Sequence, residues 1–155
     1  HQPLTPVVFL TMALAGGSLL AGQIWAAYYL LPAAAIAIEV FWRLGDQRFA
    51  EAGSTMETAT GLGAIGTVRL FEPPHTGDNY LLKEMVYVVG RKHAVVLRAI
   101  ATFGIALLPF LLLLLSDSRV VIALAVLLHL VGALAARWLF FAEAEHVVGL
   151  YYGKR

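Results

Sequence analysis

The sequence predicts an all-α integral membrane protein, a helical bundle of about four transmembrane helices in a single domain over residues 1–155. Hydrophobic residues make up 60% of the chain and charged residues only 14%, whereas soluble domains carry about 25% charged residues. The apolar residues gather in runs close to the roughly 20 residues that a helix needs to cross a bilayer. Most charges lie instead between Arg43 and Arg98. A long polar loop is therefore expected between the second and third spans.

The first two spans are predicted over residues 4–20 and 24–44. Pro3 and Pro6 fit the start of the first helix, where a missing N–H costs nothing. Gly22 and Gln23 interrupt the apolar run, and aromatic residues at both ends of the second span are typical of membrane interfaces. Because the break is short, a single long tilted helix is the alternative, and we favour two helices.

The last two spans are predicted over residues 99–116 and 120–140. Pro109 is expected to kink the third span. The helical composition of the fourth continues to about Tyr152, which would give a helix of roughly 33 residues and ~50 Å. The final turns of such a helix would project beyond the bilayer or lie along its surface.

The predicted docking loop covers residues 45–98. Ser54-x-x-Glu57 is a capping-box pattern, so a short helix is expected to begin there. Residues 79–96 place apolar side chains at helical spacing, which indicates an amphipathic helix at the membrane interface. Residues 61–66, GLGAIG, match a dinucleotide-binding pattern. We reject that function because no strand is expected before them, and we interpret them as a turn.

Basic residues indicate the orientation of the chain. They gather on the docking loop and near the C-terminal end, while only Arg119 lies at the opposite end. Two spans separate the two basic groups, so both groups face one side. Because basic loops stay in the cytoplasm, we expect the loop and the C-terminus there. A net charge of +1 argues against nucleic acid as a partner.

Two ionisable residues are expected inside the membrane, where such residues are functional candidates. Glu39 precedes Arg43 by four residues, so it forms either an ion pair that reaches the interface or part of a proton path. His129 lies near the middle of the last span. It could bind haem, bind a quinone, or donate a hydrogen bond to a neighbouring helix. A haem held by two histidines would need a second one at that depth, and the sequence offers none.

Two further groups lie at the membrane surface. Residues 91–93, Arg-Lys-His, are either an anchor for anionic headgroups or donors to a quinone or a docked subunit. Glu143 and His146 share a helix face, as in carboxylate-bridged metal helices. Facing carboxylates are missing, so we favour interface packing for this pair.

Two motifs resemble a known family. Residues 68–98, VRLFEPPHTGDNYLLKEMVYVVGRKHAVVLR, and residues 137–153, RWLFFAEAEHVVGLYYG, are similar to the C-terminal half of the membrane anchor subunit of dimethyl sulfoxide reductase-type molybdoenzymes. The resemblance extends from Gly61 onward, whereas the first two spans share only general character and the Pro-Leu-Thr-Pro start. Family members are longer, so we expect the N-terminal half of the anchor to be missing from this chain.

The resemblance implies a non-catalytic subunit of an oxidoreductase in a bacterial or archaeal inner membrane. Such an anchor holds an iron–sulfur subunit and a molybdopterin catalytic subunit. It exchanges electrons with quinone or quinol, menaquinone or ubiquinone, in anaerobic or sulfur-compound respiration. It holds no metal or haem itself, and the lack of cysteine agrees with this. A cytoplasmic loop favours the sulfite-oxidising relatives.

The resemblance also assigns residues. Those expected close to the quinone are Arg69, His75, Arg91, His93, Arg137 and His146. Those expected to dock the partner subunits are Glu72, Asp78, Asn79, Tyr80 and Glu84. Two alternatives remain from the sequence: a haem-b-type cytochrome anchor, and a non-redox membrane transport or assembly protein. Polar residues gather outside the membrane rather than at its midplane, which counts against transport.

Overall fold

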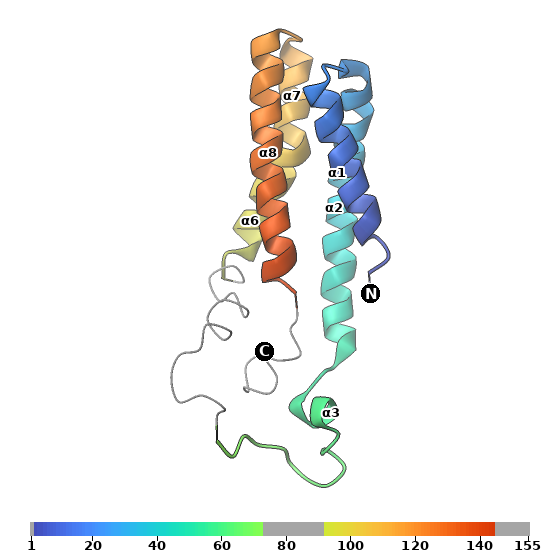
Figure 1. Cartoon of the computed structure of the whole chain (residues 1–155), viewed down its shortest axis with the longest axis vertical. Coiled ribbons are helices and arrows are strands. Elements are labelled where there is room, and N and C mark those ends of the chain that lie inside the picture. Colours follow the sequence, from blue (N-terminus) through green and yellow to red (C-terminus); the bar gives the residue numbers. More distant parts are fainter. Residues whose placement is uncertain (1, 73–91, 145–155) are drawn as a thin grey trace.

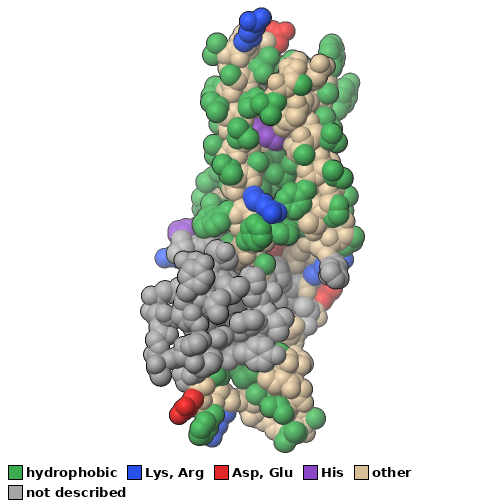
Figure 2. All heavy atoms as spheres, viewed as in Figure 1, with side chains coloured by type: hydrophobic (Ala, Val, Ile, Leu, Met, Phe, Trp, Pro, Cys, Tyr) green, Lys and Arg blue, Asp and Glu red, His purple; other side chains and the backbone are tan. Residues whose placement is uncertain are grey.

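The computed structural model, which describes residues 2–72 and 92–144, is all-α, as predicted (Figure 1). Three of its helical segments are long and apolar enough to cross a membrane: Ile24–Arg48, Ala94–Leu115 and Arg119–Ala142. Hydrophobic side chains cover much of the bundle's outer surface (Figure 2). A bundle with an apolar exterior is suited to lipid rather than water, so the chain has the architecture of a multi-pass membrane protein.

The first hairpin consists of two helices, which confirms the two-helix interpretation and makes the single long helix wrong. α1 (Thr5–Leu20) and α2 (Ile24–Ala52) are joined by a turn in which Gly22 has φ 65°. Only glycine adopts that left-handed conformation readily. α1 has 16 residues and is shorter than the three candidate spans. α2 continues eight residues past its predicted end and stops at Gly53, which is left-handed (φ 51°).

The second hairpin is made by one continuous apolar segment and the last helix. The segment comprises α6 (Ala94–Thr102), a π-helical turn η1 (Phe103–Leu107) and α7 (Leu108–Leu115). The π turn lies just before Pro109, where a kink was expected, and such a turn widens a helix locally. α8 (Arg119–Ala142) is capped at its N-terminus by Ser118, whose hydroxyl accepts from the N–H of Val121.

α8 ends earlier than its composition predicted. The uninterrupted helix expected up to Tyr152 is wrong, because α8 ends at Ala142 and Glu143 forms its C-cap. The carboxylate of Glu143 accepts a hydrogen bond from Arg98 at 2.9 Å, and this contact holds the end of the helix against α6. Residues 145–155 lie outside the described residues.

The short helix of the polar segment is α3 (Met56–Thr60). Its existence was predicted, but its capping box is formed by Thr55 and Thr58 rather than Ser54 and Glu57. The cap is one residue further along because Thr58 Oγ1 accepts from the Thr55 N–H at 2.8 Å. Residues 63–65 then form a turn. Most of the amphipathic helix expected over 79–96 lies outside the part of the chain that the structure describes.

The two hairpins lie side by side, with both tight turns at one end of the bundle and the polar segment at the other (Figure 1). Tyr28 on α2 donates from its hydroxyl to the carbonyl of Leu113 on α7 at 2.9 Å, near the turn end. Within the second hairpin, Gly104 and Gly132 let the two backbones touch: a Cβ added at Gly132 would lie 2.6 Å from the carbonyl carbon of Gly104. Such close approach through small residues is a common way for membrane helices to pack.

Candidate functional site

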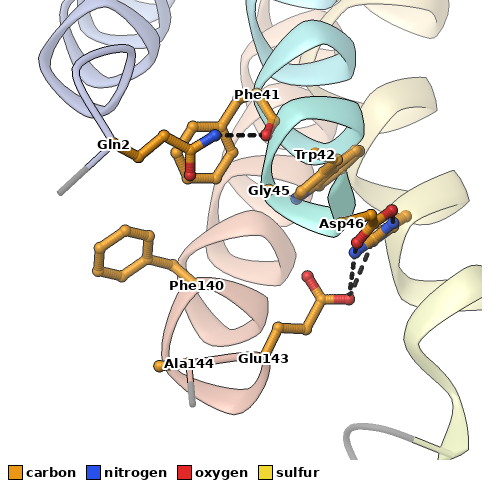
Figure 3. A pocket seen from close by; sticks show the side chains of 9 residues that line it. Gln2, Phe41, Trp42, Gly45, Asp46, Phe140, Glu143 and Ala144 are labelled. Atoms are coloured by element: carbon orange, nitrogen blue, oxygen red, sulfur yellow. Dashed lines mark hydrogen bonds and ion pairs between the residues drawn. The ribbon is translucent and has the colours of Figure 1, made fainter. Parts of the chain in front are cut away.

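One guanidinium joins three helical elements at the polar end of the bundle (Figure 3). Arg98 on α6 donates to both carboxylate oxygens of Asp46 on α2, at 2.7 and 2.8 Å. Its Nε donates to Glu143, just after α8, at 2.9 Å. The ring of Trp42 lies 5.5 Å from the same guanidinium. Bidentate pairing of this kind fixes orientation as well as charge, so Arg98 sets how these three elements meet.

A cavity of about 150 Å³ lies beside this cluster. The amide of Gln2 closes one side of it by donating to the carbonyl of Phe41 at 2.6 Å (Figure 3). The lining combines three aromatic rings with two carboxylates and one guanidinium. Its members are Gln2, Phe41, Trp42, Gly45, Asp46, Arg98, Phe140, Glu143 and Ala144.

The polar end of the bundle contains Glu143, one half of a pattern found in metal-binding helices. Among residues 2–72 and 92–144, no group of three histidine or acidic side chains is placed to hold a metal ion. Glu143, one half of the predicted Glu143–His146 pair, is bonded to Arg98, and His146 lies outside the described residues. Glu143 therefore has a structural role here.

Glu39 pairs with a different residue from the one expected. The hydroxyl of Thr102 on α6 donates to the Glu39 carboxylate at 2.7 Å. The predicted ion pair with Arg43 is absent among the described residues, because Glu39 turns toward α6 while Arg43 is exposed. A hydrogen bond between α2 and the second hairpin replaces a contact along one helix.

His129 on α8 is the buried ionisable side chain of the bundle's interior, with only 4% of its surface exposed. Its Nδ1 lies 2.7 Å from the carbonyl oxygen of Ile105 in the π turn. A carbonyl can only accept, so Nδ1 carries the proton and donates. Of the three roles considered for His129, a hydrogen bond to a neighbouring helix is present. It leaves Nε2 available for a ligand.

A groove of about 660 Å³ runs between α1 and α8 and includes His129 in its wall. Small residues of α1 shape it, since a Cβ added at Gly16 would lie 2.7 Å from His129 Nε2. Arg137 lines it toward the polar end. The full lining is Phe9, Met12, Ala13, Gly16, Gly17, Leu20, His129, Leu130, Ala133, Leu134 and Arg137.

Arg137 was expected near a quinone, and the structure places it over aromatic rings. Its guanidinium carbon lies 4.5 Å from the ring centre of Phe141, 5.1 Å from that of Phe9 and 5.5 Å from that of Phe140. Cation–π contacts of this kind are strong where water is scarce. They hold the charge at the edge of the groove.

The other expected site residues are dispersed where they can be seen. Arg69 and Glu72 are exposed in the segment after α3, and His93 is exposed at the N-cap of α6. No contact among the described residues joins Arg69, His93 and Arg137. The remaining predicted residues lie outside the described part of the chain: His75, Asp78, Asn79, Tyr80, Glu84, Arg91 and His146.

Sequence reasoning missed three residues on which the geometry of these two sites depends: Gly16, Asp46 and Arg98. A signal for Arg98 and Asp46 existed, since opposite charges stand where neighbouring spans reach the same side of the membrane. Nothing in the sequence pairs Gly16 with His129, because that contact depends on how α1 crosses α8.

The three candidate spans define the class as a multi-pass α-helical membrane protein, and one of these spans carries the buried His129. Compared with known protein families, curated proteins and solved structures, the chain gives no match.

Proposed function

We propose that this chain is the membrane anchor subunit of a complex iron–sulfur molybdoenzyme. In this role it docks the iron–sulfur and molybdopterin catalytic subunits at its polar end and exchanges electrons with the quinone pool. The observation that carries the proposal is the motif pair at residues 68–98 and 137–153, which resembles that family of anchors. The anchor is a non-catalytic part of an oxidoreductase in a bacterial or archaeal inner membrane.

The arrangement of the bundle supports the proposal. Both long polar stretches of the sequence, between α2 and α6 and after α8, leave from the same end (Figure 1). A soluble partner subunit would meet both from one side. Arg98 links the helix ends from which these stretches leave, through its bonds to Asp46 and Glu143. These bonds give the docking surface a rigid base.

α1 completes the bundle as a fourth span in this proposal. Its 16 residues are about 24 Å long at ~1.5 Å per residue, a little short of the ~30 Å hydrocarbon core. Its exposed side chains Val7, Leu10 and Leu14 suit contact with lipid. The basic residues favour a cytoplasmic position for the polar end.

Affinity purification tests the docking role. The full parent gene is tagged and expressed in its own membranes, and complexes are recovered in mild detergent for metal analysis and mass spectrometry. Molybdenum together with a ferredoxin-like iron–sulfur subunit is the expected result. Recovery of the chain without iron or molybdenum would make the resemblance misleading and favour the non-redox alternative.

Site-directed variants test the quinone role in the same complex. His75→Ala and Arg91→Ala are expected to lower quinone-linked turnover while the catalytic subunits stay on the membrane. Arg119→Ala, at the opposite end of the bundle, is the matched control. Normal turnover in both test variants would remove these residues from the quinone assignment.

A further inference from the structure

We propose that the groove between α1 and α8 binds a membrane-soluble ring compound through a hydroxyl group, which donates a hydrogen bond to Nε2 of His129. If the compound is a quinol, the inference deepens the proposed function and rests on it. For any other ring compound with a hydroxyl group, the inference does not depend on the proposed function.

The tautomer of His129 decides which kind of group can bind. Nδ1 donates to the carbonyl of Ile105 at 2.7 Å, so in the neutral ring Nε2 carries a lone pair and accepts. A ligand at Nε2 must therefore bring a proton on oxygen or nitrogen. A hydroxyl satisfies this condition, whereas the carbonyl of an oxidised quinone does not.

Nε2 of His129 is a polar atom without a hydrogen-bond partner among the described residues, in an apolar environment. It has no hydrogen-bond partner within the described chain, although every fully buried side-chain nitrogen and oxygen there has one. Nε2 is therefore not fully buried, and the groove, whose wall includes His129, gives access to it. An acceptor left without a donor in hydrocarbon costs free energy, because lipid tails have no proton to offer. A donor in the groove would remove that cost.

The dimensions favour a slender ring over a protein helix. His129 is 4% exposed, and Gly16 stands so close to Nε2 that a methyl group there would lie 2.7 Å away. A helix with a diameter of about 10 Å would rest on the rim of the groove. A flat ring can enter edge-on, and about 660 Å³ is within the usual range for small-molecule sites.

The rest of the groove suits such a ligand. Gly17, Ala13 and Ala133 give it flat walls, and Phe9 and Met12 supply apolar contact. Arg137 lies at the polar end with its charge held over aromatic rings. It is two helical turns from His129, about 12 Å along the axis, so a second polar group on the ligand would find a donor there.

Nitrogen-15 NMR of the purified chain in lipid nanodiscs tests the site directly. With labelled histidine, the Nε2 resonance of His129 is followed during titration with a short-chain benzoquinol under reducing conditions, with its oxidised quinone, and with a 4-alkylphenol. We expect the quinol to shift the resonance at a concentration at least tenfold lower than the quinone needs. A matching shift with the phenol would mean that the site accepts ring hydroxyls in general. No shift with the phenol would mean that the site is selective for quinols.

Two variants separate binding from folding, with binding followed by calorimetry in the same nanodiscs. His129→Asn keeps a donor near the Nδ1 position for Ile105 but removes the Nε2 acceptor, so helicity should remain and quinol binding should be lost. Gly16→Ala fills the entrance and should also abolish binding. Gly66→Ala, an equal change at an exposed position where nothing lies within 4 Å of the new Cβ, should bind normally.

Three outcomes would overturn the proposal. They are equal shifts with quinol and quinone, an unchanged Nε2 resonance with all three compounds, or a Soret band on adding haem that disappears in His129→Asn. The last would assign Nε2 to iron. None of these depends on partner subunits, so failure here is distinguishable from failure of the anchor proposal, which the purification experiment decides.

Discussion

His129 on α8 donates from Nδ1 to the main-chain carbonyl of Ile105 at 2.7 Å. In a regular helix that carbonyl would accept from residue 109, which is Pro109 and has no N–H to give. Membrane helices tolerate proline where a neighbouring helix supplies the missing donor. The buried histidine and the proline are therefore parts of one arrangement, although twenty residues separate them in the sequence.

His129→Leu should destabilise the bundle by about 1–3 kcal/mol, the usual result of leaving a buried polar group without its partner. The cost should fall in a Pro109→Ala background, because alanine returns an N–H to the helix. The coupling is measured on four proteins: the unaltered chain, the two single variants and the double variant. Their unfolding is followed by helicity during titration with a denaturing detergent. Equal cost in both backgrounds would contradict the link between His129 and Pro109.

Gly132→Ala should prevent the close packing of α8 on the π turn. The new Cβ would lie 2.6 Å from the carbonyl carbon of Gly104, 2.9 Å from the carbonyl oxygen of Ala101, and against the amide nitrogen of Ile105. Backbone atoms cannot rotate aside as a side chain does, so we expect the free energy of unfolding to fall by ~1–3 kcal/mol. Gly17→Ala, where nothing lies within 4 Å, is the control, and thermal unfolding in detergent compares the two. Equal melting temperatures would show that the helices can separate without cost.

Arg98→Lys should weaken the polar end nearly as much as Arg98→Ala. Lysine keeps the charge, but its ammonium lacks the planar fork by which arginine bonds both oxygens of Asp46 and also Glu143. We expect losses of about 1–3 kcal/mol, typical of hydrogen bonds to charged groups. Arg43→Ala, at an exposed position of α2, is the comparison, and denaturant unfolding is the measurement. Full rescue by lysine would mean that charge alone matters.

Sidedness can be read with single cysteines, because the chain has none of its own. Gly66→Cys lies in the polar segment and Asp117→Cys in the turn between α7 and α8, at opposite ends of the bundle (Figure 1). A membrane-impermeant thiol reagent added to intact cells should label one and spare the other, and labelling of both after lysis is the control. We expect Asp117→Cys to react from outside. Labelling of both in intact cells would contradict the bundle's orientation.

The apolar runs predicted the class of fold and the break between α1 and α2, because length and hydropathy are local properties. The helix ends were harder to predict. α2 runs on to Ala52, where left-handed Gly53 ends it, and its added turns include Asp46, which pairs with Arg98. α8 stops at Ala142 although the following residues have a helical composition. The sequence also marked His129 as a candidate. Its tautomer depends on Ile105, and its access depends on Gly16, so the chemistry of the site required the crossing of three helices.

The two turns at the far end of the bundle have a consequence for how the protein enters its membrane. Residues 21–23 carry no charge, and residues 116–118 carry only that of Asp117. Arg119 at the start of α8 adds one basic side chain at this end. In the proposed orientation, each helical pair would carry little polar material across the lipid, and each pair could complete its backbone hydrogen bonds before it meets the other.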